Sequence, residues 1–297
     1  MTDTASATST PHPFPGTFAR RSSVWRRLRG HRLFMTGLIL FAFAVAMAVS
    51  AGLVAPHNPL QNNFRYRLGA PTGVYLLGTD GFGRDVLSRV LHGARVSLRI
   101  GLMVVILNGI LGTFIGSTAG YFRRLDNIVM RIMDGLMAFP AILLAIALAA
   151  VLGASEINVV LALTAAYTPR TARIVRASVL VIRELEYVQA AVAVGAGYLR
   201  ILFRHILTNS MAPLIVQLTF IFAVSVLAEA VLSFIGVGPP PPTPTWGNII
   251  ADGRNYIREA PWISLLPGFA IAVTVLGLNL LGDGLRDVLD PRMRVER

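Results

Sequence analysis

The sequence predicts an all-α membrane protein with six transmembrane helices. Three observations support this fold class: 54% of the 297 residues are hydrophobic, only 14% are charged, and the mean hydropathy is +0.63. Water-soluble domains of this length are far less apolar. Because bundles of apolar helices serve transport, signalling and catalysis alike, composition leaves the function open, and the segments between the helices must decide it.

The N-terminal region predicts a tail followed by a membrane span. Residues 1–32 are rich in Ser, Thr and Pro and end in an arginine cluster, so we expect a disordered cytoplasmic tail. The apolar run at 33–55 has about 23 residues, which exceeds the 7 to 15 of a signal-peptide core and suffices to cross a bilayer. We therefore predict that residues 33–55 form the first transmembrane helix.

Five further apolar stretches complete the predicted bundle. They lie at 98–119, 132–152, 157–177, 211–235 and 264–281. Pro140 predicts a kink in the third span. The fourth span is kept although Pro169 shortens its apolar run, because omitting it would place two arginine-rich loops on opposite sides of the membrane. This division gives an outer loop at 56–93, a core of five helices at 94–283 and a cytoplasmic tail at 284–297.

The arginines set the predicted orientation. All 27 basic residues are arginine, and most of them lie on the inner side if both termini are cytoplasmic, as the preference of positive residues for cytoplasmic loops requires. The formal charge of +12 does not indicate nucleic acid binding, because the arginines flank apolar segments and form no basic domain. The absence of lysine favours a bacterium with a GC-rich genome.

Several kinds of chemistry are missing from the sequence. Without cysteine the chain has no disulfide, thiolate metal site or cysteine nucleophile, and its five histidines show no metal-ligand spacing. No nucleophile with a base, paired carboxylates or nucleotide motif is found. We predict that the chain is not an enzyme and holds no metal or cofactor.

Few ionisable residues fall inside the predicted spans. Glu229 lies within the fifth span, an energetically costly position that marks a possible pathway residue. A buried partner would make it structural, and we favour that interpretation. Asp134 with Arg131, and Asp283 with Arg286, are expected to pair, since three residues separate the members of each pair along one helix face.

The longest predicted cytoplasmic loop, at about 184–209, has the pattern of a folded element. Apolar residues recur at helical spacing on both sides of Gly195 and Gly197, which permit the positive φ of a break between helices. The loop therefore predicts a hairpin of two short helices. Its small residues Ala190 and Ala191 would let the backbone of another protein approach closely.

A turn-rich segment is predicted on the outer side. Gly78, Gly83 and their neighbours favour turns, and Asp80 can bond nearby backbone amides or pair with an arginine. A phosphate-binding loop is the alternative, but the spacing GxxxxGK[ST] is missing. Trp246 and Trp262, further along the chain, are interpreted as interfacial anchors, and a contact with a partner protein on the outer side is the alternative.

Four stretches resemble one family of membrane proteins. AAVAVG at 190–195, preceded by EYVQ and followed by RILFRHIL, resembles the EAA loop of bacterial ABC importer permeases, although Gln189 stands where that motif has Glu. LGTDGFGRDVLSRVLHGARVSL (77–98), AVLSFIGVGPPPPTPTWGNIIADGRNY (230–256) and LLGDGLRDVLDPRMR (280–294) resemble the second permease of the dipeptide/oligopeptide/nickel class.

The resemblance implies a type I ABC importer transmembrane domain with a cytoplasmic coupling helix. It assigns two sets of residues. The ATPase-coupling loop would use Glu186, Tyr187, Gln189, Ala190, Ala191 and Gly195, and an extracytoplasmic motif would use Gly78, Thr79, Asp80, Gly83, Arg84 and Asp85. The chain would then be a permease subunit that moves di- or oligopeptides, or similar small solutes, across the bacterial cytoplasmic (inner) membrane.

The resemblance also implies partners. These are a second homologous permease, two ABC ATPase subunits that hold ATP and Mg, an extracytoplasmic substrate-binding protein and the lipid bilayer. The alternative function is an ATP-independent secondary transporter or channel, which would usually carry several ionisable groups at mid-membrane and inverted repeats. A membrane scaffold is a third possibility, but it would have no use for an exposed cytoplasmic hairpin.

The predicted orientation can be tested with single cysteines introduced into a chain that has none. A cysteine at Asn63 or Thr243 should react with a membrane-impermeant reagent in intact cells, because both positions are predicted to face outward. A cysteine at Ser9 or Tyr198 should not react. The reverse labelling pattern would overturn the topology.

Overall fold

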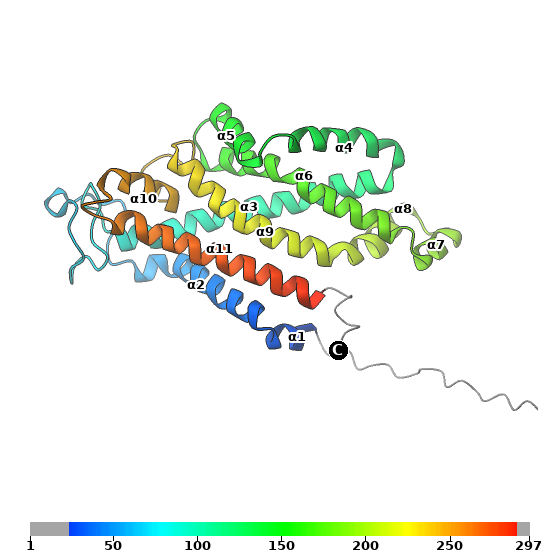
Figure 1. The fold of residues 1–297 in the computed structure, drawn as a ribbon, viewed down its shortest axis with the longest axis horizontal. Helices are drawn as coiled ribbons and strands as arrows, with labels where there is room; N and C mark the ends of the chain where they lie inside the picture. The colour runs from blue at the N-terminus through cyan, green and yellow to red at the C-terminus, as the bar shows by residue number, and fades with distance from the viewer. Residues whose placement is uncertain (1–23, 290–297) are drawn as a thin grey trace, which may run out of the picture.

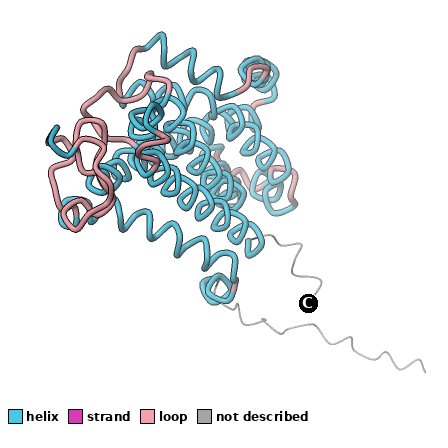
Figure 2. Tube along the Cα trace, turned by 60° about the vertical axis from the view of Figure 1, so that its left-hand side comes forward, coloured by secondary structure: helices cyan, strands magenta, loops and turns pink. Residues whose placement is uncertain are grey.

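The computed structural model describes residues 24–289, which are helical apart from loops and one isolated β-bridge between Thr79 and Asp85. Figure 2 shows helices throughout, with much of the loop structure gathered on one side. The all-α prediction is confirmed for these residues. Residues 24–30 of the predicted N-terminal tail form a short helix, α1 (Val24–Gly30), the last two residues of that tail cap and begin the next helix, and residues 1–23 lie outside the described residues.

Five long helical stretches run side by side along the longest axis of the molecule (Figure 1). They are α2 (Arg32–Val54), α3 (Val86–Tyr121), α6 (Glu156–Ile182), α9 (Thr208–Phe234) and α11 (Trp262–Leu289). Helix α3 begins at Val86, so the predicted outer loop at 56–93 is shorter than expected. Helix α11 continues through Leu289 into the predicted C-terminal tail.

The shorter elements occupy the two ends of this bundle. One end, called the α10 end, holds the 55–85 loop with the 3₁₀ turn η1 (Phe64–Tyr66), α10 (Trp246–Gly253) and the turn η3 (Arg254–Tyr256). The opposite end, called the α7 end, holds α7 (Glu186–Ala193) and α8 (Tyr198–Arg200), as Figure 1 shows. A π-helical segment, η2 (Ile201–Leu207), joins α8 to α9.

The predicted span at 132–152 is not one straight helix. Helices α4 (Arg123–Met137) and α5 (Ala141–Leu152) meet at an angle of 89°. Pro140 lies at the break, where it lacks an N–H for the helix and disfavours helical geometry at Phe139. With 12 residues, α5 is about 18 Å long, too short to cross a bilayer alone.

Ion pairs fasten α4 to α6. Arg176 donates from Nε and Nη2 to both carboxylate oxygens of Asp126, at 2.5 and 2.6 Å. Arg173 of α6 pairs with Asp134, so the predicted Asp134–Arg131 pair is wrong. Arg173 reaches Asp134 because α4 lies antiparallel to α6 and packs beside it (Figure 1). Within residues 24–289, Asp283 and Arg286 form no ion pair either.

By length and composition, four helical stretches of the described chain can each cross a membrane, and the bent pair α4–α5 would make a fifth. The four are Arg32–Val54, Val86–Tyr121, Tyr198–Phe234 and Trp262–Leu289. Helix α6 is long enough, at about 40 Å for 27 residues, but it carries Arg170, Arg173 and Arg176. These arginines, spread over the second half of α6, distinguish it from the four stretches, each of which has an apolar 18-residue window with at most two charged residues.

Buried apolar residues form separate clusters along the bundle. At the α10 end, Trp246 is fully buried among residues of α2, α3, α9 and α11, and its indole N–H donates to the carbonyl of Val90 at 3.1 Å. The interpretation of Trp246 as an interfacial anchor is therefore wrong. Hydropathy cannot distinguish an interfacial tryptophan from one that a folded loop has covered.

Glycines allow two helix pairs to pack backbone against backbone. A Cβ at Gly37 of α2 would lie 2.4 Å from the backbone nitrogen of Leu281 in α11, and one at Gly277 would lie 2.8 Å from that of Phe41. On α3, a Cβ at Gly116 would lie 2.4 Å from the carbonyl oxygen of Ala172 in α6. Small residues drive helix association in membranes because they permit this close approach.

Two glycines of α11 provide a matched test of this packing. Alanine favours a helix over glycine by about 1 kcal/mol, so Gly268→Ala, where an added Cβ meets open space, should leave the melting temperature equal or higher. Gly277→Ala should lower it, since the methyl group would collide with α2. Equal shifts in the purified protein would show that α2 and α11 do not pack closely.

Candidate functional site

Helix α7 is a short element whose end is fixed by local backbone geometry. Glu186 lies in its first turn, where the helix dipole favours a negative charge. Gly195 adopts φ +80°, and the amides of Gly195 and Ala196 donate back to the carbonyls of Val192 and Ala191 at 2.9 and 3.0 Å. This is a Schellman motif, which needs glycine because other residues are strained at positive φ. The predicted role of Gly195 in the turn is confirmed.

The second arm of the predicted hairpin differs from the expectation. Instead of a separate short helix, α8 runs through η2 into α9, so one helical stretch extends over Tyr198–Phe234. Gly197 has φ −66° and only precedes this stretch. The π-helical turns of η2 shift the hydrogen-bond register, and Thr208 Oγ1 donates to the carbonyl of Phe203 at 3.1 Å. Such π-segments occur frequently at functional sites.

One buried side chain and several hydrogen bonds hold α7 to the bundle. Val188 is only 1% exposed and belongs to an apolar cluster with residues of α6, η2 and α9. Gln189 Nε2 donates to the carbonyl of Arg183 at 2.8 Å, and Asn209 Nδ2 donates to the hydroxyl of Tyr187 at 3.0 Å. Arg183 in turn donates from Nη1 to the carbonyl of Gly120 at the end of α3, at 2.8 Å. Helix α7 is thus tied to α3, α6 and α9.

The outward side of α7 combines small and apolar residues. Glu186, Tyr187, Gln189 and Ala190 are exposed, and Ala191 is half-buried. Large apolar side chains at the end of α7 and in the segment that follows it are also exposed: Val192, Val194, Leu199 and Phe203. Val194 is 84% exposed. We call these eight residues with Ala191 the α7 surface. A grouped apolar surface with a polar rim is typical of a protein contact.

At the α10 end, the predicted Asp–Arg pairing exists within a larger buried ion cluster. Asp80 is fully buried and accepts from Arg84 Nε at 2.7 Å and from Arg89. Both arginines also reach Asp252 of α10, each at 2.9 Å. Two buried guanidinium groups therefore share two carboxylates, and the cluster joins the 77–85 segment, α3 and α10.

The remaining motif residues shape the backbone around this cluster. Asp85 caps α3 by accepting from the amide of Ser88 at 2.9 Å, and Asp80 accepts from the amide of Phe82 at 2.8 Å. Thr79 Oγ1 accepts from the amide of Gly69 at 2.8 Å. Gly83 has φ +73°, and a Cβ there would lie 1.8 Å from the carbonyl oxygen of Asn63. The motif is thus a structural unit that folds the 55–85 loop onto the bundle.

Sequence reasoning missed Arg89, Asp252 and Asn209. Arg89 was predicted to lie in the outer loop, whereas it lies in the first turns of α3, which begins at Val86. Asp252 is 163 residues further along the chain, and Asn209 is 22 residues from Tyr187. No local pattern announces such distant partners. The available signal was that Arg89 lies in the 77–98 stretch and Asp252 in the 230–256 stretch, and that both stretches resemble the same family.

Glu229 is fully buried in α9. Its Oε1 accepts from the hydroxyl of Ser233 at 2.6 Å, whereas its Oε2 has no hydrogen-bond partner in the described structure. No arginine pairs with it among the described residues. Its role, in the pathway or in the packing, remains a prediction. Within residues 24–289, no three His, Asp or Glu side chains gather as metal ligands would.

The ion cluster predicts unequal effects of removing its two carboxylates. Asp80→Asn leaves two buried arginines without their fully buried partner, and should destabilise the fold by about 3–5 kcal/mol. Asp252→Asn should cost at most about 1 kcal/mol, because its side chain is 36% exposed and Asp80 still serves both arginines. Melting of the two purified variants measures the difference. Equal losses would contradict a cluster centred on Asp80.

Comparison with known families identifies the architecture. Residues 109–295 match the family described as binding-protein-dependent transport system inner membrane component. Residues 20–71 match the N-terminal transmembrane domain of oligopeptide transport permease C. The two matches together include α1, α2, the last third of α3 and every later helix.

Similar proteins extend over nearly the whole chain. A Brucella abortus protein named as a peptide transport system permease is 53% identical, over 100% of both chains. The dipeptide transport system permease protein DppC of Alkalihalophilus pseudofirmus is 43% identical, over 92% of this chain and 91% of its own. The di/tripeptide permease DppC of Pseudomonas aeruginosa is 42% identical, over 91% of each. The chain therefore belongs to the family of binding-protein-dependent transport system inner membrane components, as a membrane permease of the dipeptide/oligopeptide type.

Proposed function

We propose that this chain is one permease subunit of an ATP-driven importer for di- or oligopeptides or similar small solutes. The names of its relatives supply the cargo class. The observation that carries the proposal is the α7 surface, a preformed apolar contact at one end of the bundle. ATP hydrolysis belongs to separate subunits in this proposal, and the chain itself catalyses no reaction.

The proposed assembly places the α7 end in the cytoplasm. Two ABC ATPase subunits, which hold ATP and Mg, would bind the permeases: one at the α7 surface of this chain and the other at the matching surface of a second, homologous permease. The α10 end would face an extracytoplasmic binding protein. In this proposal the bent pair α4–α5 and helix α6 bring the spans to six, both termini are cytoplasmic, and the protein lies in the bacterial inner membrane.

The attachment of α7 suggests how a movement of the ATPase reaches the membrane. Helix α7 is hydrogen-bonded to α9 and to Arg183 at the end of α6, and Arg183 is bonded in turn to α3. A displacement of α7 would therefore move these helices together, as in shear and rigid-body transitions. Cargo moves in one direction if the cavity between the permeases opens first outward and then inward. ATP drives the cycle when the nucleotide-bound and free ATPases favour different arrangements.

The alternative is a secondary transporter or channel. Glu229 is the feature that favours it, because an unpaired buried carboxylate inside a span can carry a proton. Co-purification separates the two proposals: an importer permease brings down an ATPase, and a secondary transporter does not.

Matched glycine variants test the coupling proposal. Gly195→Val should reduce retained ATPase and substrate-stimulated ATP hydrolysis, since a residue at φ +80° costs about 1–2 kcal/mol in the left-handed region. Gly197→Val should behave like the parent, because Gly197 has φ −66° and open space around it. Ala190→Trp should block close approach of the ATPase without disturbing the fold, because Ala190 is exposed.

The measurements are uptake, ATP hydrolysis and bound ATPase in reconstituted complexes. Uptake and bound ATPase at the parent level in both Gly195→Val and Ala190→Trp would refute α7 as the coupling element.

A further inference from the structure

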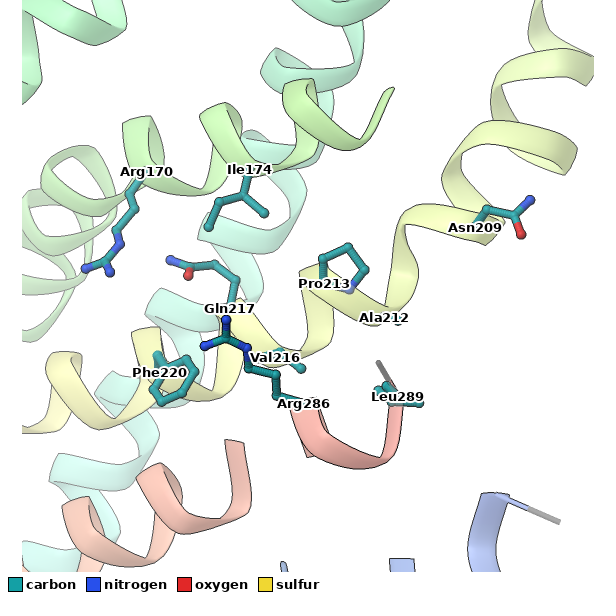
Figure 3. Close-up of a pocket in the computed structure, with 10 residues that line it drawn as sticks. All are labelled: Arg170, Ile174, Asn209, Ala212, Pro213, Val216, Gln217, Phe220, Arg286 and Leu289. Carbon is teal, nitrogen blue, oxygen red and sulfur yellow. The ribbon is translucent and has the colours of Figure 1, made fainter. Parts of the chain in front are cut away.

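A cavity of about 540 Å³ lies between α6, α9 and α11, in the half of the bundle nearer the α7 end. Arg170 and Ile174 line it from α6, residues 209–220 of α9 line it on a second side, and Arg286 and Leu289 of α11 close a third (Figure 3). Binding sites for small molecules have volumes of about 300–1,000 Å³ and combine apolar walls with a few convergent polar groups.

Arg170, Gln217 and Arg286 line this cavity with side chains that donate hydrogen bonds, and no carboxylate of the described residues lines it. In the view of Figure 3, the amide of Gln217 lies between the guanidinium groups of Arg170 and Arg286. Within residues 24–289, the side chain of neither arginine makes an ion pair or a hydrogen bond. Gln217 is only 6% exposed, and its Nε2 has no hydrogen-bond partner in the described structure.

The two arginine side chains are exposed, but the buried amide of Gln217 is unfavourable unless an acceptor completes it. A buried amide nitrogen without a partner costs about 1–3 kcal/mol. Arg170 lies near the middle of the 27-residue α6, where a charge facing lipid would be costly and is found instead facing a partner or water. Two guanidinium groups and an N–H donor together suit a carboxylate, which accepts up to four hydrogen bonds and binds arginine in paired geometry.

We propose that this cavity is a site on the cargo pathway, in which Arg170, Gln217 and Arg286 receive a carboxylate of the transported molecule. The inference rests on the proposed import function. The cavity's apolar wall, formed by Ile174, Val216 and Phe220, accepts an uncharged part of the same molecule. A terminal carboxylate beside an apolar side chain has this chemistry. An anionic lipid headgroup shares the charge, and the test separates the two.

The test uses the assembled complex in phosphatidylcholine nanodiscs, with Ala212→Cys as a reporter in the cavity. Two thiol reagents of similar size, one carrying a sulfonate and one a trimethylammonium group, label this cysteine, and mass analysis of this chain gives each rate. A local potential of about 1 kT changes the two reagent concentrations about threefold in opposite directions, so the sulfonate should be favoured by about sevenfold or more.

Neutral variants connect this preference to the proposed residues. Arg170→Gln and Arg286→Gln should each lower the sulfonate preference. Arg131→Gln removes the same charge from α4, away from the cavity, and should leave it unchanged. A preference that is absent from the parent, or that survives both cavity variants, overturns the proposal.

Protection by small peptides identifies the occupant. N-acetyl-dialanine, added directly so that no binding protein selects it, should slow the labelling, and its C-terminal amide should not. Gln217→Leu should weaken this protection. Equal protection by acid and amide overturns the carboxylate assignment, as does protection by phosphatidylglycerol nanodiscs without peptide, which would assign the cavity to lipid. Uptake of dialanine by the parent complex is measured separately, so failure of peptide import is not confused with failure of the cavity assignment.

Discussion

The close approach of α3 to α6 is the contact on which the other parts of the structure depend. Glycines at four-residue spacing, Gly112, Gly116 and Gly120, let α3 lie directly against Thr171, Ala172 and Val179 of α6. A bidentate ion pair between Arg99 and Glu156 fastens the same helices nearer the α10 end, at 2.7 and 2.5 Å. Van der Waals contact drives such packing in a bilayer, because lipid tails are as apolar as the helix surfaces and the hydrophobic effect does not favour one helix contacting another.

This contact determines what can be attached at each end. Helix α6 carries α4 through two ion pairs and leads directly into α7, while the end of α3 receives the hydrogen bond from Arg183. The start of α3 carries Arg84 and Arg89 into the ion cluster with α10. The two polar ends of the molecule are therefore connected by one rigid pair of helices. A permease that converts movement at one end into access at the other requires such a connection.

The sequence predicted the parts that depend on local pattern. Apolar runs located the long helices, and Gly195 located the Schellman turn, because helical spacing and positive φ are properties of neighbouring residues. Partners distant in the chain were not predictable: Asp134 pairs with Arg173 rather than Arg131, and Asp252 completes the cluster around Asp80. The break before α5 was predicted as a kink at Pro140, but its 89° angle depends on how α4 packs against α6.

The central claim is that α7 is a preformed extension of the α3–α6 pair. Hydrogen exchange at the amides of α7, measured in the permease with and without its ATPase subunits, tests this claim most directly. If Val188 and the bonds of Gln189 and Tyr187 hold α7, its amides beyond the first turn exchange slowly even without the ATPase. Fast exchange that slows only when the ATPase binds would show that docking creates the helix, and would contradict the claim.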